Sequence, residues 1–60
     1  MLVLDDVRVL SDAGAVLVLD IRRQRVVIAK RNLQAGTTVR TEGDRGRVVL
    51  TERFANAIGI

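Results

Sequence analysis

Short apolar runs with strand-like patterns dominate the first half of the chain. Leu2–Leu4 and Val7–Leu10 predict strand structure that bends at the acidic pair between them. Ala15–Ile21 is a nearly unbroken apolar run rich in branched residues, and its length suits a strand better than a helix. We expect it to form a central strand buried on both faces, followed by a second buried strand at Val26–Ala29.

The second half is organised around Val26–Arg40, in which two β-prone runs flank a loop. The loop is expected at Asn32–Gly36, and the threonine-rich segment Thr37–Thr41 predicts a strand after it. Further along, Glu42–Gly46 predicts a turn and Arg47–Leu50 a strand.

Turn chemistry separates these runs. Ser11–Gly14 predicts a turn in which Asp12 bonds to the backbone ahead of it. Arg22–Arg25 is expected to reverse the chain without a glycine. The glycines that we expect to be critical for turns are Gly14, Gly36 and Gly46.

An internal echo accompanies the turns. Each copy has the form Val-Arg…Asp-x-Gly-x-Val, beginning at Val7 and again at Val39. Reuse of the same hairpin turn chemistry explains it, and duplication within a pseudo-symmetric barrel is the alternative.

The tail Thr51–Ile60 fits two structures. As a helix, Thr51 would cap it, Phe54 and Ile58 would share a face, and Gly59 would end it. As a strand, the even-numbered residues would share a face and place polar Asn56 among apolar side chains.

Length and composition predict one small domain, residues 1–60. Valine occurs ten times and proline is absent, which favours strands. We therefore expect an all-β (mainly β) fold, a small barrel or β-clip of about five to six short strands, with or without one short C-terminal helix.

The apolar content is high for so small a volume. Hydrophobic residues make up 48% of a chain without cysteine or histidine, so disulfides and the commonest zinc sites are excluded. Chains of this size usually gain stability from bridges, metals or partner chains. We expect a homo-oligomer, or a subunit of a larger protein assembly, whose interface includes Phe54, Ile58 and Ile60.

Charge is distributed unevenly. The first twenty residues hold four aspartates and one arginine, and the other forty hold nine cations and three acids, within a net charge of +3. One interpretation of the basic half is a patch that binds polyanions. The alternative is that the cations lie on a solvated hairpin tip, where they keep a sheet edge from pairing with other chains and bind no ligand. A third option is that the acidic start of one subunit meets the basic tip of the next. The candidate polyanion-binding residues are Arg22, Arg23, Arg25, Lys30, Arg31, Arg40, Arg45 and Arg47.

Catalysis is not expected. The chain lacks histidine, cysteine and tyrosine, and its one serine, Ser11, has no base beside it. Asp5 and Asp6 are adjacent, so a regular strand would point them to opposite faces. Phe54 is the only aromatic residue, which makes stacking on single-stranded nucleic acid a poor fit. We expect no catalytic, cofactor or metal site.

No membrane association is expected from the pattern. The apolar start meets Asp5 and Asp6 after four residues, and no run approaches the length of a membrane span. The chain is predicted to be soluble, in the cytoplasm or associated with a particle.

The segment VVIAKRNLQAGTTV resembles the opening motif of SAF domains, the antifreeze-like modules with the β-clip fold. The residues that carry the likeness are Val26, Val27, Ala29, Arg31, Asn32, Leu33, Ala35, Gly36, Thr37 and Val39. Gln34 stands where proline is common, and the histidines typical of the related sugar-acid dehydratase module are absent. The resemblance implies a fold more than an activity, since SAF modules serve in sugar-acid enzymes and in flagellar and pilus assembly.

Residues 39–60 are similar to the core of AbrB-type swapped-hairpin DNA-binding regulators. The matching residues are Val39, Arg40, Gly46, Arg47, Val48, Val49, Leu50, Ile58, Gly59 and Ile60. Thr51 replaces the family's proline, and the strands that would follow Ile60 are missing. That family binds DNA as a dimer, which makes Arg40, Arg45 and Arg47 candidates by resemblance.

Three hypotheses follow. The first is a non-enzymatic, oligomeric structural or interaction module that assembles with itself or into a larger particle or appendage. The second is a dimeric protein that binds duplex DNA through phosphate contacts and arginine readout. The third is a designed or reconstructed small barrel without a biological role.

Overall fold

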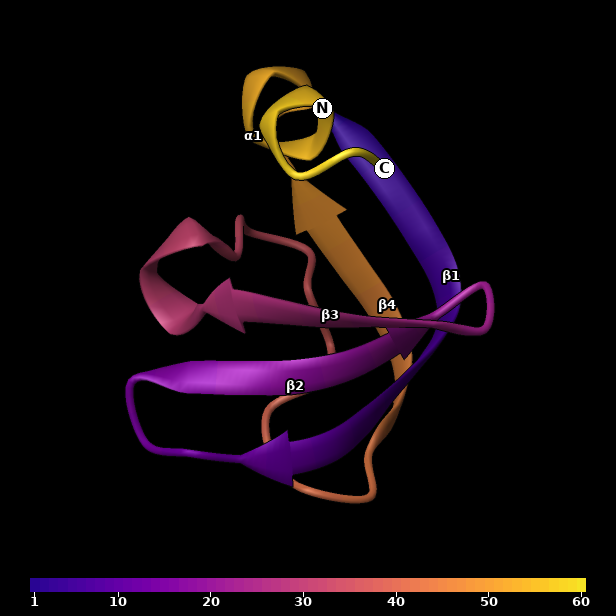
Figure 1. The fold of residues 1–60 in the computed structure, drawn as a ribbon, viewed down its shortest axis with the longest axis vertical. Helices are drawn as coiled ribbons and strands as arrows, with labels where there is room; N and C mark the ends of the chain where they lie inside the picture. Colours follow the sequence, from indigo (N-terminus) through magenta and orange to yellow (C-terminus); the bar gives the residue numbers. More distant parts are fainter.

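Four antiparallel strands and a short C-terminal helix make up the fold in Figure 1, a computed structural model that describes residues 1–60. The strands form one open sheet in the order β3-β2-β1-β4. The expectation of a mainly β fold is confirmed, with four strands where about five to six were expected. The elements are β1 (Leu2–Asp12), β2 (Val16–Ile21), β3 (Gln24–Ala29), the 3₁₀ turn η1 (Lys30–Asn32), β4 (Arg45–Leu50) and α1 (Glu52–Ala57).

β1 is the strand that both halves of the sheet share. Its first part pairs with β4 and its last part with β2, and Arg8 pairs with both neighbours. The register against β4 shifts between Leu4 and Val7, where Asp6 has φ of 58°. A bulge of this kind bends and twists a strand, so the predicted bend at the acidic pair is confirmed. Figure 1 shows the β2–β3 hairpin running across the β1–β4 pair as a result.

β2 lies inside the sheet, as expected, but only one of its faces is fully buried. Leu17, Leu19 and Ile21 are buried, whereas the residues between them are half-buried. β3 is an edge strand, and Val27 on it is 57% exposed. The predictions that Ala15–Ile21 is buried on both faces and that Val26–Ala29 is a second buried strand are therefore wrong, because no second layer covers the outer face of this hairpin.

Residues 37–41 do not form the expected strand, although they run beside β4. The Thr38 N–H donates to the Arg47 carbonyl, and the Arg47 N–H donates to Thr38 Oγ1, both at 2.9 Å. Two residues further along β4, the Gln34 N–H donates to the Val49 carbonyl and the Val49 N–H donates to Thr37 Oγ1. Threonine hydroxyls thus replace the backbone acceptors of a true strand, and the outer edge of β4 is closed at these positions.

Gly46 lies inside β4 and not in a turn, and β4 begins at Arg45 instead of Arg47. The backbone of Gly46 does not have positive φ, and a Cβ at this position would collide with Thr38 Oγ1. Glycine is needed here because the 37–41 segment approaches β4 closely. The expectation of a turn-critical role for Gly46 is wrong, whereas Gly14 and Gly36 do adopt positive φ in their turns.

The two copies of the internal echo adopt different structures. Asp12 accepts a hydrogen bond from the Gly14 N–H ahead of it, while Asp44 accepts from the Arg40 and Thr41 N–H groups behind it. The first copy opens in β1, and the second opens in the 37–41 loop. The echo is therefore shared composition and not a structural repeat.

The tail forms the helical alternative. Thr51 Oγ1 accepts from the Phe54 N–H at 3.1 Å, which caps α1 as expected. At the other end, the Ile60 N–H donates to the Ala55 carbonyl and the Gly59 N–H to the Asn56 carbonyl, the bond pattern of a Schellman motif. This ending turns the chain terminus back toward the protein.

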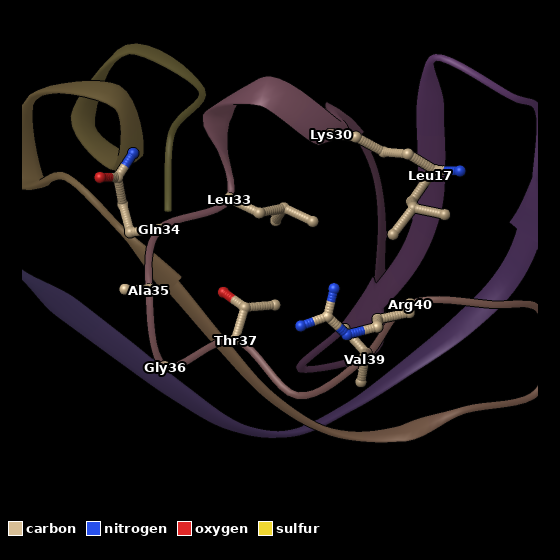
Figure 2. A pocket seen from close by; sticks show the side chains of 9 residues that line it. All are labelled: Leu17, Lys30, Leu33, Gln34, Ala35, Gly36, Thr37, Val39 and Arg40. Carbon is tan, nitrogen blue, oxygen red and sulfur yellow. The ribbon is translucent and has the colours of Figure 1, made fainter.

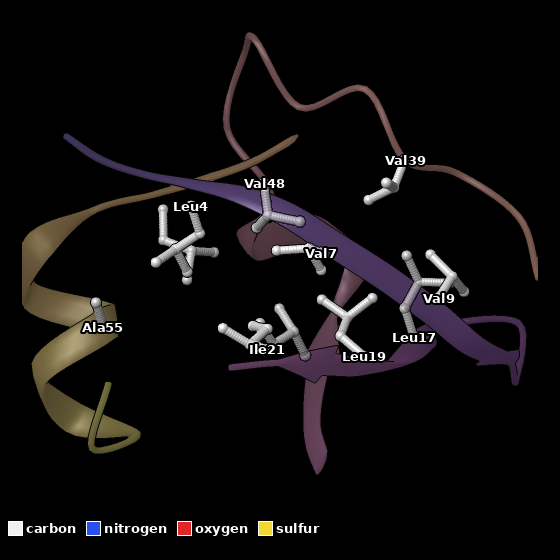
Figure 3. Packing of buried hydrophobic residues seen from close by; sticks show 11 residues of the cluster. Leu4, Val7, Val9, Leu17, Leu19, Ile21, Val39, Val48 and Ala55 are labelled. Carbon is white, nitrogen blue, oxygen red and sulfur yellow. The ribbon is translucent and has the colours of Figure 1, made fainter. Parts of the chain in front are cut away.

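The core lies between the bent sheet, α1 and the 37–41 loop. Every fully buried side chain in it is apolar, and the eight largest are Leu17, Leu19, Ile28, Leu50, Val7, Val9, Val39 and Val48. Figure 3 shows side chains from β1, β2 and β4 meeting here, with Val39 approaching from the loop and Ala55 from α1. Stability therefore depends on contacts between segments distant in sequence.

Candidate functional site

A row of charged side chains crosses the outer face of the sheet, the face turned away from the core. The register pairs Arg25 with Asp20, Asp20 with Arg8, and Arg8 with Arg45, which takes in all four strands. Residues directly opposite on neighbouring strands present their side chains on the same face. We call these four residues the charged row. Arg8 was not among the sequence candidates, although its position between two core-facing valines marks it as outward-pointing.

The turn between β2 and β3 brings two more cations to this row. Arg22 and Arg23 have φ of 52° and 68°, and Ile21 pairs with Gln24 across them. Positive φ at both central residues is the hallmark of a type I′ turn, which Asn-Gly normally occupies. Arg22 and Arg23 join Asp6, Arg8, Asp20 and Arg45 around a depression of about 430 Å³. Four arginines and two aspartates thus surround one depression that only charged residues line.

Ion pairs with the acidic start of the chain neutralise part of this basic surface. Arg45 Nε lies 2.9 Å from Asp6 Oδ1, and Arg47 Nε lies 3.6 Å from Asp5 Oδ1. All four side chains are exposed, so each pair contributes little to stability. Both aspartates reach cations of β4, contrary to the opposite faces expected of a regular strand, because the bulge at Asp6 interrupts the alternation.

A second group of cations lies elsewhere, beside a pocket of about 440 Å³. Figure 2 shows Lys30 and Arg40 at this pocket, with the guanidinium of Arg40 near Thr37 and Val39. Lys30 Nζ is 2.9 Å from Asp12 Oδ1, and this hydrogen bond, with that from the Gly14 N–H, lowers the pKa of Asp12. Leu17, Leu33, Gln34, Ala35 and Gly36 complete the lining.

The eight candidate cations therefore do not form one patch. Arg22 and Arg23 lie at one end of β3, whereas Lys30 and Arg31 lie in η1 at its other end. Six strand residues separate them, which corresponds to about 20 Å. The structure groups Arg22, Arg23, Arg25 and Arg45 around the charged row, places Arg47 beside it on β4, and leaves Lys30, Arg31 and Arg40 apart.

The residues expected at an oligomer interface lie together at one end of the molecule. Phe54, Ile58 and Ile60 are half-buried and pack against the core of their own chain. Figure 1 shows the chain start beside α1, and the Met1 amino group lies 3.7 Å from Glu52 Oε1. Met1 is 69% exposed and Val3 50% exposed at this end. We call this region the apolar end.

No group of three His, Cys, Asp or Glu side chains is arranged to hold a metal ion. Both helical segments are too short to cross a membrane. Comparison of the chain with models of known families, with curated proteins and with solved structures found no match.

Proposed function

We propose that this protein is a non-enzymatic interaction module that associates with copies of itself. The observation that carries the proposal is the apolar end, where Met1 and Val3 expose large hydrophobic side chains beside the half-buried tail. A 60-residue chain has only twelve buried residues, so covering this surface would add substantially to its apolar burial. The composition supports a role without catalysis, because the usual bases and nucleophiles are missing.

Self-association is tested by light scattering and by melting at several concentrations. We expect an oligomer at micromolar concentration and a melting temperature that falls on dilution. Val3→Lys should shift the equilibrium toward monomer, whereas Val27→Lys, a matched change at a similarly exposed strand position away from the apolar end, should not. A stable monomer whose melting temperature ignores dilution would rule out the proposal.

Duplex DNA binding is the second candidate, supported by the turn at Arg22 and Arg23. Two non-glycine residues with positive φ are costly, and such strain is concentrated at functional sites. These two side chains share a depression with Arg8 and Arg45, and neither makes an ion pair. The arrangement suits phosphate contacts, and the residues proposed for them are Arg8, Arg22, Arg23, Arg25 and Arg45.

The salt dependence of duplex DNA affinity separates this candidate from a merely solvated turn. Each neutralised phosphate adds about −0.9 to the slope of log K against log salt. Changing Arg22 and Arg23 to Gln should therefore flatten the slope by about two without altering the oligomeric state. The matched control changes Arg31 and Arg40, which lie away from the charged row, and should leave the slope unchanged. DNA binding that is weak at low salt from the outset would reject this function.

A further inference from the structure

The outer edge of β3 is a sheet edge that no other segment covers. Along β4, residues Gln34–Thr38 supply hydrogen-bond partners to Arg47 and Val49, but the only strand paired with β3 is β2. The pairing with β2 is regular from Val16↔Ala29 to Ile21↔Gln24, and the Lys30 N–H extends it by donating to the Ala15 carbonyl at 2.9 Å. The opposite edge of β3 is therefore straight and open over six residues.

The register identifies the free backbone groups. In an antiparallel ladder, alternate residues exchange hydrogen bonds with the partner strand, and those between them point outward. Gln24 flanks a two-residue turn and Lys30 bonds to Ala15, so the even-numbered residues of β3 face β2. The N–H and C=O groups of Arg25, Val27 and Ala29 consequently point away from the sheet. Unpaired groups in such a row form a template for an added strand.

The chemistry of this edge selects the strand that can be added. No acidic residue occurs between Asp20 and Glu42, and that interval contains five cations flanking or within β3. Of these, Arg22, Arg23, Arg25 and Arg31 make no ion pair, and only Lys30 has an acidic partner. Between the charged ends, exposed Val27 offers an apolar contact on the outer face. The edge thus combines backbone donors and acceptors with an excess of positive charge.

A second copy of β3 is a poor occupant. If two such strands paired in antiparallel fashion about Val27, the basic turn at Arg22 and Arg23 of each copy would come near Lys30 and Arg31 of the other, and this approach of like charges is unfavourable. We propose instead that the β3 edge binds an extended acidic protein segment as a fifth, antiparallel strand. The matching segment has an apolar residue opposite Val27 and, two positions later, an acidic residue opposite Arg25. This names a partner for the proposed interaction module, on a surface separate from the apolar end.

The probe is the hexapeptide Glu-Thr-Val-Thr-Glu-Thr, blocked at both ends, with Lys in place of both Glu as its control. Its valine can lie opposite Val27 and its second glutamate opposite Arg25. We expect the glutamate peptide to bind at least about tenfold more tightly than the lysine peptide at low salt. Arg25→Gln should weaken this preference, and because the Arg25 side chain is exposed we expect the fold to persist.

N-methylated peptides test whether binding is strand addition or charge attraction alone. Methylation of the valine nitrogen removes an N–H that would face β3 and should weaken binding at least about tenfold, whereas methylation of the following threonine nitrogen should not. In the protein, Val27→Pro removes an outward N–H and leaves the β2 ladder intact, so it should abolish peptide binding without unfolding the sheet. Circular dichroism and thermal melting of each variant verify that the fold persists.

Three results would overturn the proposal. The first is equal binding of the two charge-opposed peptides, and the second is equal binding of the two methylated peptides. The third is loss of self-association in Val27→Pro, which would show that a second copy occupies this edge. Val3→Lys distinguishes failure of this proposal from failure of the proposed self-association. It should weaken self-association through the apolar end and leave peptide binding at the β3 edge unchanged.

Discussion

Backbone conformation at single residues sets much of the geometry of this protein. Asp6, Arg22 and Arg23 have positive φ although they are not glycines, a conformation that costs roughly 1–2 kcal/mol per residue. The first bends β1, and the other two close the β2–β3 hairpin and bring arginines to the charged row. Elsewhere glycine takes such positions, and Gly36 with φ of 100° is the most constrained by its surroundings.

Substitution of Gly36 tests this constraint. A side chain at Gly36 would have to adopt positive φ, and its Cβ would lie 3.2 Å from Val49 Cγ2. Gly43 also has positive φ, but nothing lies within 4 Å of a Cβ there. We expect Gly36→Val to lower the free energy of unfolding by roughly 1–3 kcal/mol, and Gly43→Val to lower it less. Denaturant titration measures both values, and equal losses would show that the Val49 contact does not matter.

Asp44 gives the protein an acid-sensitive turn. Hydrogen bonds from the Thr41 and Arg40 N–H groups, at 3.0 and 2.9 Å, lower its pKa from the ordinary 3.8. The folded state stabilises the ionised form of the Asp44 carboxylate relative to the unfolded state. Its contribution to the free energy of unfolding is therefore complete above pH 3.8 and is lost as pH falls through the lowered pKa.

The pH dependence of melting checks this assignment. Below pH 3.8 the melting temperature of the wild-type protein should fall, and it should fall less steeply in Asp44→Asn, which cannot titrate. Glu42→Gln is the matched control, because Glu42 lies in the same turn but accepts no hydrogen bond there. If the Asp44→Asn and wild-type profiles run parallel, the turn is not the acid-sensitive element.

The β2–β3 hairpin is determined by local sequence, whereas the closed edge of β4 is determined by tertiary contacts. The β2–β3 hairpin has a regular register from Val16↔Ala29 to Ile21↔Gln24, set by its two-residue turn. The segment Gln34–Thr38 lies along β4 without pairing as a strand, since threonine hydroxyls accept the bonds of Arg47 and Val49. One edge of the sheet is closed in this way, and the other remains open at β3.

Replacing the arginine turn should stabilise the hairpin. Arg22→Asn combined with Arg23→Gly installs the residues that type I′ turns prefer, so we expect the free energy of unfolding to rise by roughly 1–2 kcal/mol. The reverse order, Arg22→Gly with Arg23→Asn, is a composition-matched control that should gain less. If thermal melting shows the double variant to be no more stable than wild type, the turn geometry assigned here is incorrect. The same variant should lose any phosphate binding that depends on these arginines.

At the scale of the whole molecule, a small core carries the fold. Leu19 is completely buried at the centre of the sheet, and only eleven other residues are buried. Leu19→Ala should cost about 2–5 kcal/mol, which is comparable to the entire stability of many small domains. We therefore expect this variant to be largely unfolded at 37 °C, while Val27→Ala, at an exposed position, should change stability by no more than about 0.5 kcal/mol. A folded Leu19→Ala variant would mean that association or another source supplies the missing stability.

Interactions between neighbours in the chain could be predicted from the sequence. The Asp12–Gly14 turn, the Thr51 cap, the end of α1 at Gly59 and the bend at Asp5–Asp6 all involve residues within a few positions of each other. Their physics is local, so side-chain type and spacing were sufficient. The mainly β class followed in the same way from the length and composition of the apolar runs.

Only the tertiary structure decided which surfaces these elements share. The closeness in sequence of the basic residues predicts one patch, yet β3 holds the two ends of the basic interval about 20 Å apart. Arg8 joined the site through its pairing with both Asp20 and Arg45, residues 12 and 37 positions away. Gly46 is required by the approach of Thr38, and β3 is open because no segment returns to its outer edge. Apart from the length of β3, which is local, these features depend on how parts of the chain that are distant in sequence are placed in the fold, which pattern and spacing do not encode.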